Sequence, residues 1–186
     1  MVPRGDRSLL PQIEPFVDLV GVRLGISIAD LRSVRPATKH EPYAGLSENV
    51  GGYKVIYSVK GLYSERPASP TARIVSIGAR RDFPKDTDAS KLWQESLPRL
   101  NAVANSVPRC IRLDESDSGY IAFWRYNGGT LTLTVSEGAR VGEMDSRPTL
   151  GIVLDRGGLP RWARDVFSGT YTPPQNRRVI PCPTGL

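Results

Sequence analysis

Apolar residues recur at helical spacing in two stretches of the chain. In the first, Ile28, Leu31 and Val34 follow one another at steps of three, which predicts a helix over 28–35. In the second, steps of three and four predict a core-facing helix with the apolar side chains Leu92, Trp93, Leu97, Leu100, Ala104 and Val107. Pro98 lies inside this second stretch, and because proline lacks a backbone N–H, we expect a kink or two shorter helices there.

Both predicted helices begin with residues that can cap them. Ser27 can accept a hydrogen bond from the backbone N–H of Asp30, and Asp30 can return one to the backbone at Ser27, as in a capping box. Asp88 or Ser90 can cap the second helix. Asp86 and Asp88 have the spacing of paired catalytic carboxylates, but a role at the positive end of this helix is favoured.

Five stretches have the composition or the period of a β-strand. They are residues 53–59, 73–77, 120–126, 130–135 and 150–154. The sequence Asn127-Gly128-Gly129 between two of them predicts a β-hairpin, because Asn and Gly tolerate positive φ. Leu131, Leu133 and Val135 alternate with threonines, so we expect one buried face and one face in solvent.

The order of helix, strands, helix and strands predicts an α+β fold in which helices cover one face of an antiparallel sheet. Gly52-Tyr53 and Gly119-Tyr120 each open the first clear strand after a helix. This repetition suggests a tandem duplication of a helix-plus-strands unit. The predicted domain covers residues 21–158, and the halves of the duplication would be 21–84 and 85–158.

Proline-containing segments flank this domain. Residues 1–20 contain three prolines and are expected to form an irregular lead-in. Residues 159–186 are expected to form an extended, Pro-rich C-terminal arm, because their prolines oppose a helix or a central strand.

Composition limits the class of protein. The chain has 186 residues, of which 39% are hydrophobic, and this is enough to build a core. No apolar run approaches the roughly 18 residues that cross a bilayer, so no transmembrane span is expected. Residues 1–5 lack the apolar segment of a signal peptide and are similar to the remnant of a cleavable tag, which leaves the compartment open.

The formal net charge is +6 at pH 7. Such a charge indicates a nucleic-acid site when the basic residues form a stripe or a cluster. Here the arginines are spread along the chain, with doublets only at Arg80-Arg81 and Arg177-Arg178. The charge pattern therefore does not favour nucleic acid as a partner.

The chain has two cysteines, Cys110 and Cys182, without a CxxC motif or a nearby histidine, so no zinc site is predicted. They can form a disulfide in an oxidising compartment or remain two thiols. The sequence leaves both alternatives open, because it does not fix the distance between their Cα atoms.

The sequence predicts no catalytic residue, cofactor or metal ion. His40 is the only histidine, and its polar loop favours a solvated side chain over a catalytic base. No serine elbow, phosphate loop or dinucleotide motif is present. The segment 114–119 begins like a calcium loop, but Arg125 stands at the twelfth position, where a glutamate is needed.

Tyr120, Trp124 and Tyr126 share one face of the predicted strand 120–126. If this face is exposed it can bind a ligand or a partner, with Trp124 as the candidate contact. If it is buried, the same residues are core under a covering helix. The solvent exposure of Trp124 distinguishes the two alternatives.

The C-terminal arm carries the other candidates for partner binding. They are Trp162, Phe167, Tyr171, Arg161 and Arg164. Either the arm docks on a partner or rests on a membrane surface through these residues, or it folds back on its own sheet, with Cys182 as an anchor.

The segments Leu24-Gly25-Ile26-Ser27 and Asp30-Leu31, followed by a loop and the tyrosine-rich strand 53–59, resemble the small α+β domain of BamE/SmpA-type outer-membrane assembly lipoproteins. The tandem arrangement is similar to the related beta-lactamase-inhibitor-protein architecture. The resemblance covers about residues 22–80. It implies a non-catalytic module that binds other proteins, often at a membrane face outside the cytoplasm, and it carries over no functional residue.

These patterns predict an interaction or scaffold module rather than an enzyme. We expect an extrinsic accessory subunit of a larger membrane-associated assembly. An extracytoplasmic, membrane-peripheral location is favoured, and a cytoplasmic one stays open. The alternatives are an inhibitor or small-ligand-binding domain that uses the aromatic sheet face, and a hydrolase that uses His40.

Overall fold

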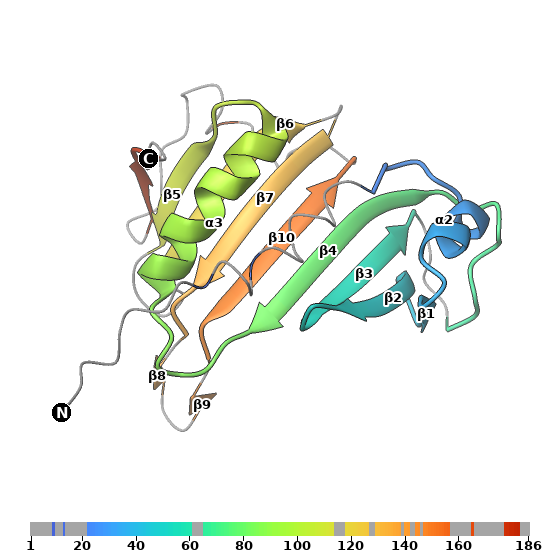
Figure 1. The fold of residues 1–186 in the computed structure, drawn as a ribbon, viewed down its shortest axis with the longest axis horizontal. Coiled ribbons are helices and arrows are strands. Elements are labelled where there is room, and N and C mark those ends of the chain that lie inside the picture. The colour runs from blue at the N-terminus through green and yellow to red at the C-terminus, as the bar shows by residue number, and fades with distance from the viewer. Residues whose placement is uncertain are drawn as a thin grey trace.

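The computed structural model describes residues 22–60, 65–113, 118–126, 129–138, 147–156 and 177–182, the strand residues 140–141 and 144–145, and the single residues 9, 13 and 165. Within this part of the chain lie a nine-stranded antiparallel open sheet and two helices, α2 (Ile28–Val34) and α3 (Ala89–Ala104) (Figure 1). The predicted α+β fold is confirmed.

The main sheet is built from nine short strands. They are β1 (Lys39–Glu41), β2 (Gly45–Val50), β3 (Tyr53–Val59), β4 (Ile74–Asp82), β5 (Arg109–Leu113), β6 (Gly119–Tyr126), β7 (Gly129–Ser136), β10 (Thr149–Asp155) and β11 (Arg177–Ile180). Strands β8 (Arg140–Val141) and β9 (Met144–Asp145) pair separately.

Two antiparallel meanders, β1-β2-β3-β4 and β5-β6-β7-β10, meet at the centre of the main sheet. The strand order is β1-β2-β3-β4-β10-β7-β6-β5-β11, and every neighbouring pair is antiparallel. The last strands of the two meanders, β4 and β10, pair in the middle of the sheet (Figure 1). Counted outward from the β4/β10 pair, β3 corresponds to β7 and β2 corresponds to β6. Gly52-Tyr53 at the start of β3 and Gly119-Tyr120 at the start of β6 therefore do not occupy equivalent positions.

Helix α3 lies along one face of the sheet and contacts β6 and β7 (Figure 1). The predicted cap is present, because the Asp88 carboxylate accepts hydrogen bonds from the backbone N–H groups of Ser90 at 2.8 Å and Lys91 at 3.3 Å. The helix buries most of the apolar stripe that the sequence predicted, namely Leu92, Trp93, Leu97 and Leu100. Packing of this stripe on the sheet positions the helix.

Pro98 does not divide the helix. Helix α3 is one element with Pro98 inside it, so the alternative of two shorter helices is wrong. The carbonyl that loses its helical partner belongs to Gln94, which is exposed to water, and the apolar stripe holds the turns on either side. The helix ends at Asn105 in a left-handed conformation, so Val107 lies beyond it and is 84% exposed rather than buried.

Helix α2 packs beside the start of β4 instead of covering the sheet. The Ile28 N–H donates to the Ala72 carbonyl at 2.9 Å. Ser27 caps the helix as predicted, since its hydroxyl oxygen accepts from the Asp30 N–H at 3.1 Å. The return bond differs from the prediction, because the Asp30 carboxylate accepts from the Ser27 hydroxyl at 2.6 Å. In the part of the chain that the structure describes, one helix covers the sheet, where the sequence predicted several.

The core lies on the face of the sheet that α3 covers, and it also includes Ile28 and Leu31 of α2. Leu131, Leu133 and Val135 of β7 are fully buried, as their alternation predicted. Thr130 was expected in solvent but is 5% exposed, whereas Thr132 and Thr134 on the same face of β7 are half-buried. Val34 was expected in the core but is 63% exposed, because α2 buries only its other face.

The predicted strands 53–59, 120–126, 130–135 and 150–154 are present within one residue of their expected bounds. The strand predicted over 73–77 is longer than expected. Strand β4 continues through Gly78 to Asp82, although glycine has a low strand propensity. Strands β1, β2, β5, β8, β9 and β11 were not predicted. His40 lies in the short strand β1 rather than in a loop.

Candidate interaction surfaces

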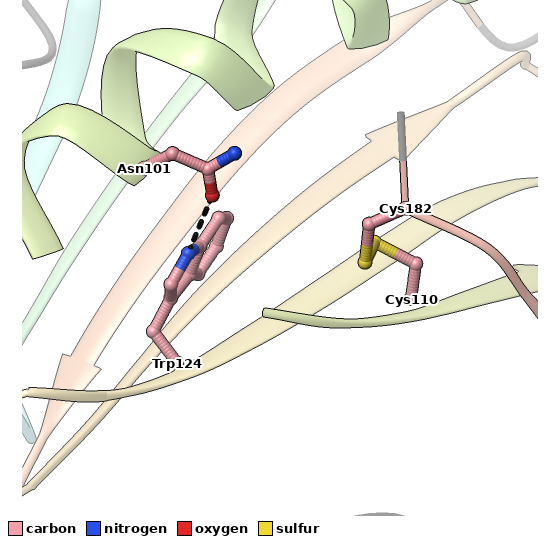
Figure 2. Close-up of a disulfide and its surroundings, with 4 residues drawn as sticks. All are labelled: Asn101, Cys110, Trp124 and Cys182. Carbon is pink, nitrogen blue, oxygen red and sulfur yellow. Dashed lines mark hydrogen bonds between the residues drawn. A yellow bond between two sulfur atoms is a disulfide. The ribbon is translucent and has the colours of Figure 1, made fainter. Parts of the chain in front are cut away.

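The aromatic face of β6 lies under α3. Trp124 is 0% exposed, and its indole N–H donates a 2.8 Å hydrogen bond to the side-chain oxygen of Asn101 on α3 (Figure 2). On the same face, the Tyr120 ring stacks on Trp93 with 5.2 Å between the centroids. Trp124, a predicted partner-binding residue, is therefore part of the core, because the helix that covers it excludes solvent and partners alike.

The remaining predicted partner-binding residues lie outside the residues that the structure describes: Trp162, Phe167, Tyr171, Arg161 and Arg164. The calcium-like segment 114–117 also lies outside them. The end of the predicted arm is described over 177–182. There β11 pairs with β5, so this part of the arm folds back on its own sheet instead of extending from it.

A disulfide joins Cys110 in β5 to Cys182, which follows β11 (Figure 2). Their Cα atoms are 5.3 Å apart. Cys110 is 1% exposed. Of the two alternatives that the sequence leaves open, the structure has the disulfide, which ties β11 covalently to the sheet.

The face of the sheet opposite α3 is open above its centre. Gly78 of β4 lies between two cross-strand neighbours, Ile56 of β3 and Val153 of β10. In the next row, Gly151 of β10 is the cross-strand neighbour of Thr134 in β7. Val153 is 42% exposed. We call these five residues, Ile56, Gly78, Thr134, Gly151 and Val153, the glycine patch.

The sheet itself does not require glycine at Gly78 or Gly151. A Cβ atom at Gly78 would have the Ile152 carbonyl oxygen, at 4.0 Å, as its nearest contact, and one at Gly151 would meet the Ala79 carbonyl oxygen at 3.6 Å. Both are ordinary contacts, and neither residue has the positive φ that favours glycine. Glycine inside a strand costs roughly 0.5–1 kcal/mol relative to alanine, and it often marks a site where a ligand or another backbone approaches closely.

Other strand glycines show what a steric requirement looks like. A Cβ atom at Gly119 would lie 2.2 Å from the Val135 carbonyl oxygen, and one at Gly129 would lie 2.4 Å from the Asp155 carbonyl oxygen. No side chain fits at such distances from fixed backbone, so packing within the sheet explains these two glycines. The comparison separates the glycines of the patch from the glycines that the fold needs.

The glycine patch forms the floor of a depression of about 660 Å³. Charged side chains of both signs stand beside it on β1, β3 and β4. The Lys54 ammonium lies 2.9 Å from the Glu41 carboxylate, and the Arg80 guanidinium lies 3.2 Å from the Asp82 carboxylate. The Arg80–Asp82 pair is exposed and Glu41 is half-buried, so each pair contributes little stability. Of these four groups, Lys54, Arg80 and Asp82 line the depression.

A buried carboxylate lies on the covered side of β2. Glu48 is 8% exposed, accepts a 2.5 Å hydrogen bond from the Tyr57 hydroxyl and lies 3.9 Å from the Arg35 guanidinium. Burial raises the pKa of Tyr57, and its hydrogen bond to Glu48 raises it further. Burial likewise raises the pKa of Tyr53 in the same strand. This network lies in the core and stabilises the first meander.

His40 Nε2 lies 2.7 Å from the main-chain oxygen of Glu65. Within the described ranges, no three histidine, cysteine or acidic side chains gather into a group that can hold a metal ion. In the same part of the chain, no helix combines the length and the apolar character that crossing a bilayer requires.

Sequence reasoning missed the glycine patch, although the chain carries a signal for it. In both Ile77-Gly78-Ala79 and Leu150-Gly151-Ile152, a single glycine interrupts an apolar strand pattern, which indicates a bulge or a close backbone approach.

In comparisons with known proteins, no family model, curated protein or solved structure matches this chain.

Proposed function

We propose that this protein is a non-catalytic protein-binding module, an extrinsic accessory subunit of a larger membrane-associated assembly, and that its partner docks on the glycine patch. The observation that carries the proposal is the pair Gly78 and Gly151. Both leave strand backbone bare in the middle of an open sheet face, where the fold has room for a side chain. Bare backbone lets a partner approach the strands directly and pack against them.

The character of the surface favours a protein over a small molecule. Small-molecule sites are concave pockets that bury most of the ligand, whereas the glycine patch lies on an open sheet face with Val153 42% exposed. Protein interfaces combine an apolar centre with a polar rim. Ile56 and Val153 provide the apolar centre here, and Lys54, Arg80 and Asp82 of β3 and β4 provide the rim.

The disulfide supports a location outside the cytoplasm. Disulfides persist in oxidising compartments and are rare in the reducing cytosol. The bridge between Cys110 and Cys182 therefore agrees with the extracytoplasmic setting that the resemblance to BamE/SmpA-type lipoproteins implies. The small-ligand alternative used the aromatic face of β6, and no observation favours it, because α3 covers that face.

Site-specific cross-linking tests the proposal. A photo-cross-linking amino acid in place of Val153 should capture one dominant partner in the native cell, which mass spectrometry identifies. The purified partner is then titrated against the wild-type chain and against Gly78→Val and Gly151→Val. Both variants should bind about tenfold more weakly or worse, because each side chain holds the partner away from the backbone.

Two control positions lie away from the patch. The same cross-linker in place of Gln94, an exposed residue of α3, should not capture that partner. Val34→Ser, on the exposed side of α2, should bind it with wild-type affinity. The proposal is overturned if position 153 captures no protein, or if folded Gly78→Val and Gly151→Val chains bind the captured partner as tightly as the wild type.

We also propose that the two meanders descend from a duplicated helix-plus-strands unit. Helix α2 precedes the first meander and α3 precedes the second. The last strands of the two meanders, β4 and β10, pair at the centre of the sheet. Sequences of homologous chains should then show residual similarity between β3 and β7, which are equivalent when counted outward from the β4/β10 pair. Similarity that instead pairs β3 with β6 would contradict this proposal.

A further inference from the structure

Strand β11 forms one edge of the main sheet. In the part of the chain that the structure describes, it is the last strand of the order and its sheet partner is β5. An edge strand presents a row of main-chain groups along its outer side, and another extended chain can pair with such a row. The disulfide holds this edge in place, so no ordering of β11 is needed when a partner binds.

An apolar groove of about 420 Å³ lies beside this edge. Its walls are the loop Ser106-Val107-Pro108, the end of β11 with Pro181, and the disulfide itself. Val107 is 84% exposed and Val179 is 53% exposed, and these are two of the five exposed large hydrophobic residues in the described ranges. The groove thus offers apolar contacts to the side chains of a strand placed along the edge.

Charge is distributed unevenly along the sheet. The charged residues of the strands at this end are all arginines: Arg109 and Arg112 in β5, Arg125 in β6, and Arg177 and Arg178 in β11. At the opposite end, β1, β2 and β3 carry lysines and glutamates together: Lys39, Glu41, Glu48 and Lys54. Arg112 already pairs with Glu137, whereas Arg109 is exposed at the start of β5. The β11 edge is therefore complementary to carboxylates through Arg109, which can bind them by charge-assisted hydrogen bonds.

We propose that an extended acidic segment of another protein adds to the β11 edge as a further strand. The edge supplies main-chain pairing, Val107 and Val179 receive apolar side chains, and Arg109 receives an acidic one. This surface is separate from the glycine patch, since β6 and β5 stand between β7, which carries Thr134 of the patch, and β11. The β11 edge is therefore a second binding site, in addition to the glycine patch of the proposed function.

A synthetic peptide tests the inference directly. The probe is an acetylated and amidated octapeptide of four Glu-Val repeats with a fluorescent label, and its binding to the full chain is followed by fluorescence anisotropy. We expect saturable binding that the corresponding Lys-Val peptide does not show. In hydrogen exchange, saturating Glu-Val peptide should slow the outward-facing amides of 177–180 by about tenfold, because they gain hydrogen-bond partners in the added strand.

Matched variants distinguish the edge from the rest of the surface. Arg109→Glu should weaken binding of the Glu-Val peptide by about tenfold, whereas Arg32→Glu on α2, with the same change in net charge, should alter it by less than about twofold. Val107→Ser should weaken it by about fivefold, and Val34→Ser, at another exposed valine, should leave it unchanged. Both pairs change exposed residues, so the fold is preserved.

The outcomes separate this inference from the proposed function. Gly78→Val should bind the Glu-Val peptide as the wild type does, so failure of one proposal leaves the other intact. Equal binding of the Lys-Val peptide, or binding without protection of the β11 amides, would overturn strand addition. Failure of the peptide to bind, together with Arg109-dependent binding of phosphatidylglycerol vesicles, would replace it with a membrane surface.

Discussion

The face of the main sheet under α3 and the face opposite it are built from the same strands but from different kinds of residue. Along β10, Leu150, Ile152 and Leu154 are buried on the covered side, whereas Gly151 and Val153 lie on the open side. The covered face is filled with large apolar side chains. Over β4, β10 and β7, the open face carries glycine, serine, threonine and charged residues, with Val153 as its one large apolar residue.

This difference shows which face the fold itself determines. On the covered face, each side chain fills space against α3 or its neighbours, so folding alone explains the residues that occur there. On the open face, Gly78 and Gly151 leave space that folding would favour filling. At the centre of the sheet the covered face carries the stability of the protein, and we attribute the open face there to binding. Toward β5 and β6, the face opposite α3 also buries Ile111 and Phe123.

Adjacent residues of β10 test this division with the largest expected effect. Ile152→Ala should lower the free energy of unfolding by about 2–4 kcal/mol, because Ile152 is 2% exposed and its removal leaves a cavity. Val153→Ala, one residue away on the open face, should change it by less than about 0.5 kcal/mol. Urea unfolding of both variants measures the contrast, and similar losses at the two positions would show that the open face is covered.

The disulfide extends the comparison to the edge of the sheet. The double variant Cys110→Ser/Cys182→Ser should lose about 2–4 kcal/mol of stability, because the bridge closes a loop with a sequence separation of 72 residues in the unfolded chain. Wild-type protein in a reducing agent should lose the same amount. If the reduced protein unfolds at the wild-type urea concentration, the edge strand is held by the sheet alone.

High pH should weaken the covered face through its tyrosines. Burial raises the pKa of both Tyr53 and Tyr57. Above the unfolded pKa of about 10, the native state retains protons that the unfolded state has lost, so stability falls by about 1.4 kcal/mol per pH unit for each such tyrosine. Urea unfolding between about pH 8 and pH 11 measures the slope. Tyr53→Phe should make the slope shallower, and an unchanged slope would exclude a contribution from Tyr53.

The covered face could be predicted from the sequence, because burial itself produces the apolar period. The alternation of Leu131, Leu133 and Val135 and the helical spacing of Leu92 and Leu97 both placed buried residues correctly. The prediction of burial was wrong at Val34 and Val107, which lie at or beyond the end of a helix and are exposed. The spacing of apolar residues does not show where a helix ends or leaves the core.

The candidate binding surfaces could not be predicted in the same way. Gly78 interrupts the apolar strand pattern, so the second half of β4 was not predicted. Gly151 belongs to the patch because of its cross-strand neighbours in β4 and β7, which the sequence does not specify. The β11 edge depends on pairing between segments far apart in the chain and on a disulfide that the sequence leaves open. Surfaces of this kind arise from long-range pairing, which has no local period.

The glycines of the sheet give the smallest change and the most specific test of the comparison. Gly78→Val should raise the free energy of unfolding by up to about 1 kcal/mol, because valine suits a strand and Gly78 has room for a Cβ atom. Gly129→Val should instead destabilise the protein, because its Cβ atom would lie 2.4 Å from the Asp155 carbonyl oxygen. Urea unfolding distinguishes the two signs. A stabilised Gly78→Val chain that no longer binds its partner would mean that this glycine serves binding at the expense of stability, and a destabilised one would assign Gly78 to the fold.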